Sequence, residues 1–222
     1  MKTALFAPCY LVGIDPSGSS RLERVNRWIR YYTKIQRDLG FQNIFLSDDG
    51  SPTELLDQLE EDPWVFENKH LGKRGNGNGV DYDYCWRALW DMRKIIEIGY
   101  EKILMVDSDT FTLNYNISQF IRDKKTGWTA FGIKKYGFPS AEIHILCQDA
   151  FSLFMEYTKG DFMDKNGTLM ERDIPFTEVV RYFNVDRYGE NRTLQNPMMD
   201  IYSQAPVDLE LHYVRRTPCG AV

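Results

Sequence analysis

The chain has 222 residues, of which 43% are hydrophobic and 14% aromatic, enough for one sizeable core, and one domain is favoured over two. The formal net charge of −5 disfavours a protein that coats nucleic acid, and no apolar segment approaches the length of a membrane span. The four cysteines form no C-x-x-C pair, which favours reduced thiols of an intracellular, cytoplasmic protein over a disulfide framework or a zinc site.

Strands and helices alternate through the first half of the sequence. Apolar runs predict strands, and apolar residues at helical spacing between them predict helices. Ser20 and Glu23 form a capping-box pattern at the start of the first helix, and Ser51 is expected to cap the second. The strands are expected at residues 4–7, 43–47, 64–67 and 103–106, and the helices at 20–39, 53–61 and 82–98. This order predicts an α/β fold with a mixed, mainly parallel sheet flanked by helices.

The second half is less regular. Strands are expected at residues 128–133, 142–147 and 209–214, and helices at 148–159 and 176–183, the latter because Pro175 suits a first helical turn. Residues 160–174 and 184–206 are expected to be irregular. We expect one domain over residues 1–222, with a nucleotide-binding half (1–112) and an acceptor-binding half (113–222).

The strand at residues 103–106 runs directly into Asp107, Ser108 and Asp109. Ligands of open α/β sheets bind at the carboxyl ends of the strands, so both acids are expected at the binding edge. Two carboxylates so close repel each other unless a divalent cation lies beside them. The pattern favours a metal site that holds a phosphate, and the alternative is a pair of turn acids.

Other polar residues follow the remaining strands of the first half. Asp48 and Asp49 end the second strand, where they either accept hydrogen bonds from a nucleotide or form a turn. The loop at residues 72–79 has four glycines together with Lys73 and Arg74, and it predicts a phosphate-binding lid or a solvated hinge.

Further candidates lie in the second half. The imidazole of His212 can complete a metal shell begun by two carboxylates, and such a set favours Mn²⁺, with Mg²⁺ as the second choice. Glu142, Glu171 and Asp173 are candidates for contact with a sugar or an acceptor hydroxyl, and surface acids are the alternative reading of each.

The three polar strand ends, taken in order, resemble the GT-A fold of nucleotide-sugar glycosyltransferases. The matching segments are Pro8 to Tyr10, Asp48 to Ser51, and the D-x-D of Asp107 and Asp109. Within that family the chain is similar to glycosyltransferase domains of algal-virus proteins that build capsid glycans. The second likeness implies a UDP-sugar donor of the glucose or rhamnose type, a glycan acceptor, a host-cytoplasm location and further catalytic domains in a longer chain.

Site roles are also implied by the resemblance. Pro8, Tyr10 and Asp48 would contact uridine, Asp107 ribose or metal, and Asp109 the metal, with Ser108 between them and His212 as a third ligand. No Glu-Asp motif for a catalytic base is evident, only Glu171-Arg172-Asp173, which leaves inversion and retention both open. Asp173 is the first candidate for the base.

Two other classes remain as alternatives. The segment from Val106 to Thr110 also resembles the first motif of haloacid-dehalogenase-type phosphatases, in which Asp107 would be a nucleophile and Asp109 a general acid. That motif usually lies on a first strand, whereas three β-α units precede it here. The second alternative is a nucleotide- or glycan-binding module that does not catalyse a reaction.

Overall fold

The computed structural model describes residues 1–14, 18–68, 83–132, 139–157, 174–187, 200–203 and 211–215. The first half contains β1 (Thr3–Cys9), α1 (Arg21–Leu39), β2 (Asn43–Asp48), α2 (Thr53–Leu56), β3 (Trp64–Glu67), α3 (Asp83–Glu97) and β4 (Lys102–Val106). The second half contains β5 (Phe111–Thr112), α4 (Tyr115–Asp123), β6 (Trp128–Gly132), β7 (Pro139–Cys147), a 3-10 turn (Gln148–Ala150), α5 (Phe151–Glu156), β8 (Glu178–Val180), β9 (Val185–Arg187) and β10 (Ile201–Ser203).

Seven strands form the main sheet in the order β3-β2-β1-β4-β7-β6-β8. Neighbouring strands are parallel except at β7, which is antiparallel to both β4 and β6. The predicted fold class, a mixed and mainly parallel sheet flanked by helices in a single domain, is confirmed. From β1 the chain builds outward through β2 to β3 and then returns to place β4 on the other side of β1. The carboxyl ends of β1 and β4 therefore flank a topological switch point, where open α/β sheets bind ligands.

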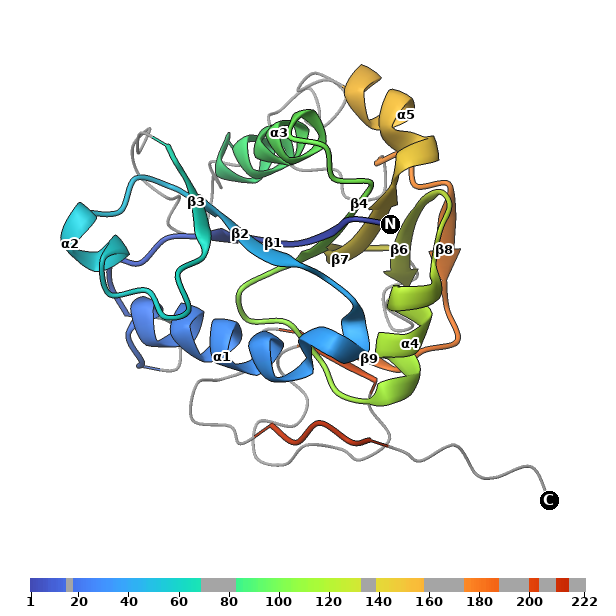
Figure 1. Cartoon of the computed structure of the whole chain (residues 1–222). Helices are drawn as coiled ribbons and strands as arrows, with labels where there is room; N and C mark the ends of the chain where they lie inside the picture. Colours follow the sequence, from blue (N-terminus) through green and yellow to red (C-terminus); the bar gives the residue numbers. More distant parts are fainter. Residues whose placement is uncertain are drawn as a thin grey trace.

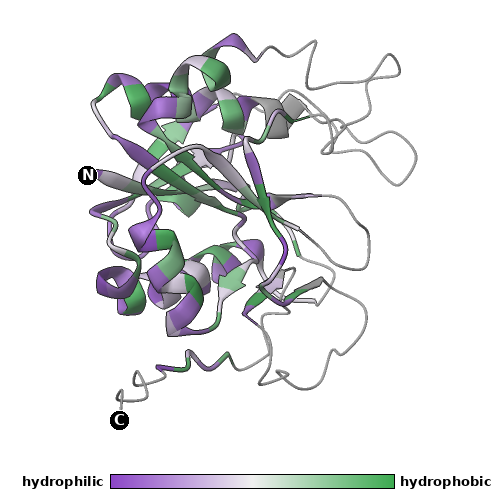
Figure 2. Ribbon diagram, turned by 90° about the vertical axis from the view of Figure 1, so that its right-hand side faces the viewer, coloured by the Kyte–Doolittle hydropathy of each residue, from purple (hydrophilic) through white to green (hydrophobic). Residues whose placement is uncertain are grey.

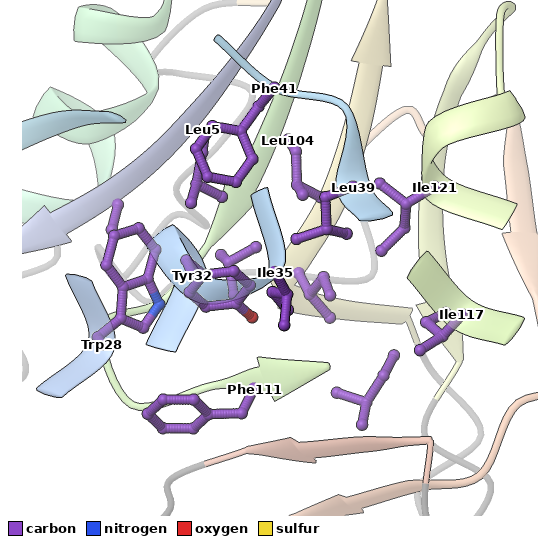
Figure 3. Close-up of a cluster of buried hydrophobic side chains, with 14 of the residues drawn as sticks. Leu5, Trp28, Tyr32, Ile35, Leu39, Phe41, Leu104, Phe111, Ile117 and Ile121 are labelled. Atoms are coloured by element: carbon purple, nitrogen blue, oxygen red, sulfur yellow. The ribbon is translucent and has the colours of Figure 1, made fainter. Parts of the chain in front are cut away.

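Helices cover both faces of the sheet, with α1 and α4 on one side and α3 and α5 on the other (Figure 1). The strands alternate their side chains between two cores, because successive residues of a strand point to opposite faces. Leu5 and Leu104 pack toward α1, as the close-up in Figure 3 shows, whereas Phe6 and Met105 belong to the core under α3. The hydrophobic colouring of the strands between more hydrophilic helix surfaces shows the same layering (Figure 2). Among the described helices, none combines the length and hydrophobicity needed to cross a lipid bilayer.

Two helix starts differ from the sequence prediction. Ser20 stands at the N-cap of α1, but its side chain makes no capping bond. Glu23 pairs instead with Arg30, at 2.6 Å. The N-cap of α2 is Pro52 rather than Ser51, because the Ser51 hydroxyl is used elsewhere: it accepts from the backbone N–H of Leu11 at 2.9 Å.

The helix predicted at residues 176–183 is wrong, because this segment contains strand β8. The side-chain hydroxyl of Thr177 accepts from the N–H of Trp128 at 2.8 Å, and β8 continues this alignment as a parallel partner of β6. The β-branched Val179 and Val180 suit that edge position, so pairing with β6 outweighs the Pro175 signal for a helix. Residues expected to be irregular include β9 and β10, which form a small second sheet with β5.

The strand predicted at residues 209–214 is reduced to a single bridge in its described part, between Val214 and Asn114. The helix predicted at residues 148–159 is split into the 3-10 turn and the shorter α5. Helix α4 was not predicted at all. Its N-cap is Asn114, whose side chain accepts from the N–H of Ile117 at 3.2 Å.

Candidate active site

The acidic motif forms a tight turn directly after β4. The N–H of Thr110 donates to the carbonyl of Asp107 at 2.9 Å, so the chain reverses within four residues instead of continuing as a strand. The side chain of Ser108 is buried, whereas Asp107 and Asp109 are partly exposed. Both carboxylates therefore lie at the carboxyl end of β4, as the sequence predicts, but a turn rather than strand alternation brings them there.

The end of β1 forms the other side of the switch point. β1 pairs with β4 only as far as Phe6, whereas it continues beside β2 to Cys9. Pro8 has no N–H that could donate to a neighbouring strand. This agrees with its position in β1 beyond Phe6, where pairing with β4 has ended. Tyr10 follows the strand, partly exposed, and the guanidinium of Arg21 lies 5.8 Å from the centre of its ring.

The carboxylate of Asp48 is buried and closes the loop after β2. It accepts from the N–H groups of Gly50 and Ser51 at 2.8 and 2.7 Å, and from the Ser51 hydroxyl at 2.5 Å. Asp49 is also buried and forms an ion pair with Arg87 of α3. These contacts favour the turn interpretation of both acids over direct contact with a nucleotide.

Helix α1 supplies positive charge that the sequence analysis did not identify. One guanidinium nitrogen of Arg24 lies 3.5 Å from a carboxylate oxygen of Asp109. Arg27 lies one turn further along α1, with its guanidinium carbon 5.1 Å from the centre of the Phe111 ring. The signal in the sequence was an arginine at every third position from Arg21 to Arg27, which places these cations along one side of a helix.

Two tyrosines of α1 hold the backbone that follows the acidic turn. The hydroxyl of Tyr32 donates to the carbonyl of Thr110 and accepts from the N–H of Thr112, each at 3.2 Å. The hydroxyl of Tyr31 donates to the carbonyl of Thr112. Burial raises the pKa of both phenols, so these hydroxyls keep their protons at neutral pH.

Glu142 lies on β7 directly beside the acidic turn. Its backbone carbonyl accepts a hydrogen bond from the N–H of Asp107 at 2.8 Å, and Glu142 as a whole is buried. Of the three acids proposed for catalysis, Glu142 is the one that falls within the described residues. Lys73, Arg74, Glu171 and Asp173 lie outside them, as does the whole loop at residues 72–79.

His212 is exposed and belongs to the segment that runs beside α4 and β5. Val214 of that segment exchanges backbone hydrogen bonds with Leu113 and Tyr115, at 2.9 and 3.1 Å. Across the described ranges, no three His, Cys, Asp or Glu side chains are grouped closely enough to hold a metal ion. His212 is therefore not brought together with Asp107 and Asp109 as a three-residue ligand set.

The two acids alone still fit a Mg²⁺ or Mn²⁺ ion that is shared with a ligand. Such hard cations prefer oxygen donors, and Mg²⁺ usually binds through one or two carboxylates together with water and substrate phosphates. Asp107 and Asp109 are both partly exposed at the carboxyl end of β4.

Comparisons with known proteins give similarity in structure only. No family model matches the sequence, and no curated protein matches it. A glycosyltransferase involved in the glycosylation of the major capsid of PBCV-1 is similar over 70% of this chain and 64% of its own, with 11% identity and a TM-score of 0.40. The mannosyltransferase PcManGT from Pyrobaculum calidifontis, in complex with GDP-Man and Mn²⁺, is similar over 81% of this chain and 54% of its own, with 7% identity and a TM-score of 0.46.

Another similar structure is 4-diphosphocytidyl-2C-methyl-D-erythritol synthase from Anaerococcus prevotii. The match covers 80% of this chain and 88% of that one, with 12% identity and a TM-score of 0.41. Glycosyltransferases are thus among the solved structures that this chain resembles. The chain spans about two thirds of the first of these proteins and about half of the second. At such identities the likeness concerns the fold alone, and one fold serves many functions.

Proposed function

We propose that this chain is a metal-dependent glycosyltransferase that moves a sugar of the glucose or rhamnose type from a UDP-sugar to a glycan acceptor. The observation that carries the proposal is the turn of Asp107 and Asp109 at the switch point between β1 and β4. Two partly exposed carboxylates, two residues apart at the end of β4, suit a divalent cation, and the ring of Tyr10 across the switch point offers a surface for a nucleotide base.

In this proposal Asp107 and Asp109 hold Mn²⁺ or Mg²⁺ together with oxygen atoms of the substrate phosphates and water. When bound, the cation would neutralise the charge that develops on the departing diphosphate. The loop that carries Lys73 and Arg74 would add charge-assisted hydrogen bonds to the same phosphates. Pro8, Tyr10 and Ser108 would complete the contacts to the nucleotide, and Asp48 would order the neighbouring loop through its bonds to Gly50 and Ser51.

The group that activates the acceptor is proposed from three acids, Glu142, Glu171 and Asp173. Glu142 has support from its position, because its backbone is hydrogen-bonded to Asp107. An inverting enzyme needs a general base near the acceptor hydroxyl, and a retaining enzyme needs a group on the opposite face of the sugar. Single replacements Glu142→Gln, Glu171→Gln and Asp173→Asn, with NMR of the anomeric product, would identify the base and the stereochemical outcome.

The direct test of the function is release of nucleoside diphosphate from a panel of nucleotide sugars with Mn²⁺ and with EDTA. We expect turnover of a UDP-sugar that requires the cation and falls by about two orders of magnitude or more in Asp109→Asn. Asp123→Asn, a change of an exposed acid at the end of α4, is the matched control. Turnover by Asp109→Asn at the wild-type rate, or phosphate release from simple phosphoesters without UDP binding, would contradict the proposal.

A further inference from the structure

Arg24 is a partly buried cation whose hydrogen-bonding capacity is largely unused within the described part of the protein. Its side chain is 16% exposed, and its Nε atom is buried without a hydrogen-bond partner there. A guanidinium has five N–H donors, and buried polar groups are nearly always satisfied in folded proteins. The unsatisfied Nε of Arg24, next to the acidic turn, leaves a donor available to an anion at this place.

The contact with Asp109 does not satisfy this arginine. The 3.5 Å between the guanidinium nitrogen and the carboxylate oxygen is within ion-pair range but longer than a charge-assisted hydrogen bond, which measures about 2.7–2.9 Å. Arg30, two turns further along α1, shows the contrast. It makes two contacts of 2.6 Å, with Glu23 and Glu60.

Charge balance indicates which anion fits. Two carboxylates and one divalent cation are neutral together, so the negative charge of a diphosphate must be balanced by cationic side chains around the site. A cation on Asp109 would also repel Arg24, because like charges a few ångströms apart are unfavourable. Both problems are solved if Arg24 turns from Asp109 to a phosphate oxygen when the metal binds.

We infer that Arg24 is an exchangeable counter-ion: it pairs with Asp109 before a divalent cation binds, and with the diphosphate of the bound nucleotide once the cation occupies the acids. This inference rests on the proposed function and adds a residue of α1 to its donor site. The exchange links the two ligands, because the metal releases Arg24 for the phosphate and the phosphate draws Arg24 away from Asp109. Such linkage is reciprocal between the two binding equilibria.

The test is a pair of titrations on Arg24→Gln, with MnCl₂ alone and with UDP at saturating MnCl₂. Removing the positive charge should strengthen binding of Mn²⁺ alone by about threefold to tenfold, since Arg24 no longer competes for Asp109. The same change should weaken binding of UDP in the presence of Mn²⁺ by about tenfold or more, since a charge-assisted contact is lost. Opposite changes in one variant are not expected from a merely structural arginine.

Two further variants make the result specific. Arg24→Lys keeps the charge and should restore most of the wild-type Mn²⁺ affinity but only part of the UDP affinity, because lysine lacks the forked geometry of the guanidinium. Arg30→Gln removes an arginine from the same helix whose contacts are with Glu23 and Glu60, and it should change neither titration. Circular dichroism confirms that each variant is folded.

The outcomes separate the inference from the function on which it rests. Suppose that wild type binds UDP with Mn²⁺, and that Arg24→Gln either changes both affinities in the same direction or changes neither. The exchange is then wrong, and the glycosyltransferase proposal stands. If wild type binds neither Mn²⁺ nor UDP, the proposed function itself fails. UMP, which has one phosphate fewer, should lose less affinity than UDP in Arg24→Gln. An equal loss for both would contradict contact with the terminal phosphate of UDP.

Discussion

The guanidinium of Arg24 and the carboxylate of Asp109 face each other at 3.5 Å, across the space between α1 and the turn that follows β4. The two residues are far apart in the sequence, and the fold brings them together because α1 packs along the segment that continues into β5. That segment is held to α1 by Tyr31 and Tyr32 through its backbone. The first helix thus positions the acidic turn as well as supplying charge beside it.

Replacement of Tyr32 by phenylalanine tests this positioning. The variant leaves the carbonyl of Thr110 and the N–H of Thr112 buried without the hydroxyl that now joins them. We expect the free energy of unfolding in urea to fall by about 1–3 kcal/mol. Because Thr110 follows Asp109 directly, we also expect the affinity for Mn²⁺ and UDP together to fall by about tenfold. Tyr182→Phe, at a residue that is 66% exposed, should change neither quantity.

Replacement of Lys102 by methionine tests the contacts that stabilise the N-terminal end of β4. The buried ammonium group donates to the carbonyls of Ile121 and Arg122, each at 2.9 Å, and to that of Lys124 at 3.3 Å. It therefore satisfies carbonyls that helix α4 leaves unpaired at its C-terminus. We expect a loss of about 2 kcal/mol or more of unfolding free energy, measured by urea titration. A loss no larger than that of Lys125→Met, at an exposed neighbour, would show that the capping contributes nothing.

The stability of the protein should depend on pH through His144. Its Nδ1 accepts from the indole N–H of Trp128 at 3.1 Å, and burial lowers its pKa to about 3. In the unfolded chain the pKa returns to about 6.5, so between about pH 6.5 and 3 the unfolded state binds the proton and the native state does not. The contribution is complete above pH 6.5 and is lost as the pH falls through this window, by up to about 1.4 kcal/mol per pH unit.

The measurement is urea unfolding at several pH values between 7 and 4, compared between wild type and His144→Gln. Glutamine offers an oxygen acceptor to Trp128 and does not titrate, so the variant should show a shallower loss of stability on acidification. Equal slopes for wild type and His144→Gln would show that this histidine is not the source of the pH dependence.

Much of the first half of the fold follows from local sequence. Apolar runs ending in polar residues located β1 to β4 within a few residues, and Gly40 ends α1 in the left-handed conformation that glycine adopts readily. The second half was predicted less well, because its strands depend on distant partners. β8 is a strand since it pairs with β6, and nothing in residues 176–183 alone outweighs the helix signal of Pro175.

The candidate site shows the same division. The position of Asp107 and Asp109 was predictable, because an apolar strand that ends in acidic residues can be recognised from the local sequence pattern. Arg24 was not identified, since the sequence shows that α1 is amphipathic but not which distant turn lies against its polar side. Asp48 shows the reverse case: its bonds to Gly50 and Ser51 form a local turn that the sequence already offered as an alternative.

The most direct test of the account is calorimetric titration of UDP into wild type and Asp109→Asn, each with saturating Mn²⁺ and with EDTA. We expect saturable binding by wild type that requires the cation, and a loss of affinity of at least about tenfold in Asp109→Asn. Asp123→Asn should bind as wild type does. Equal UDP binding with and without Mn²⁺, or an unchanged affinity in Asp109→Asn, would contradict a metal-diphosphate site at the end of β4.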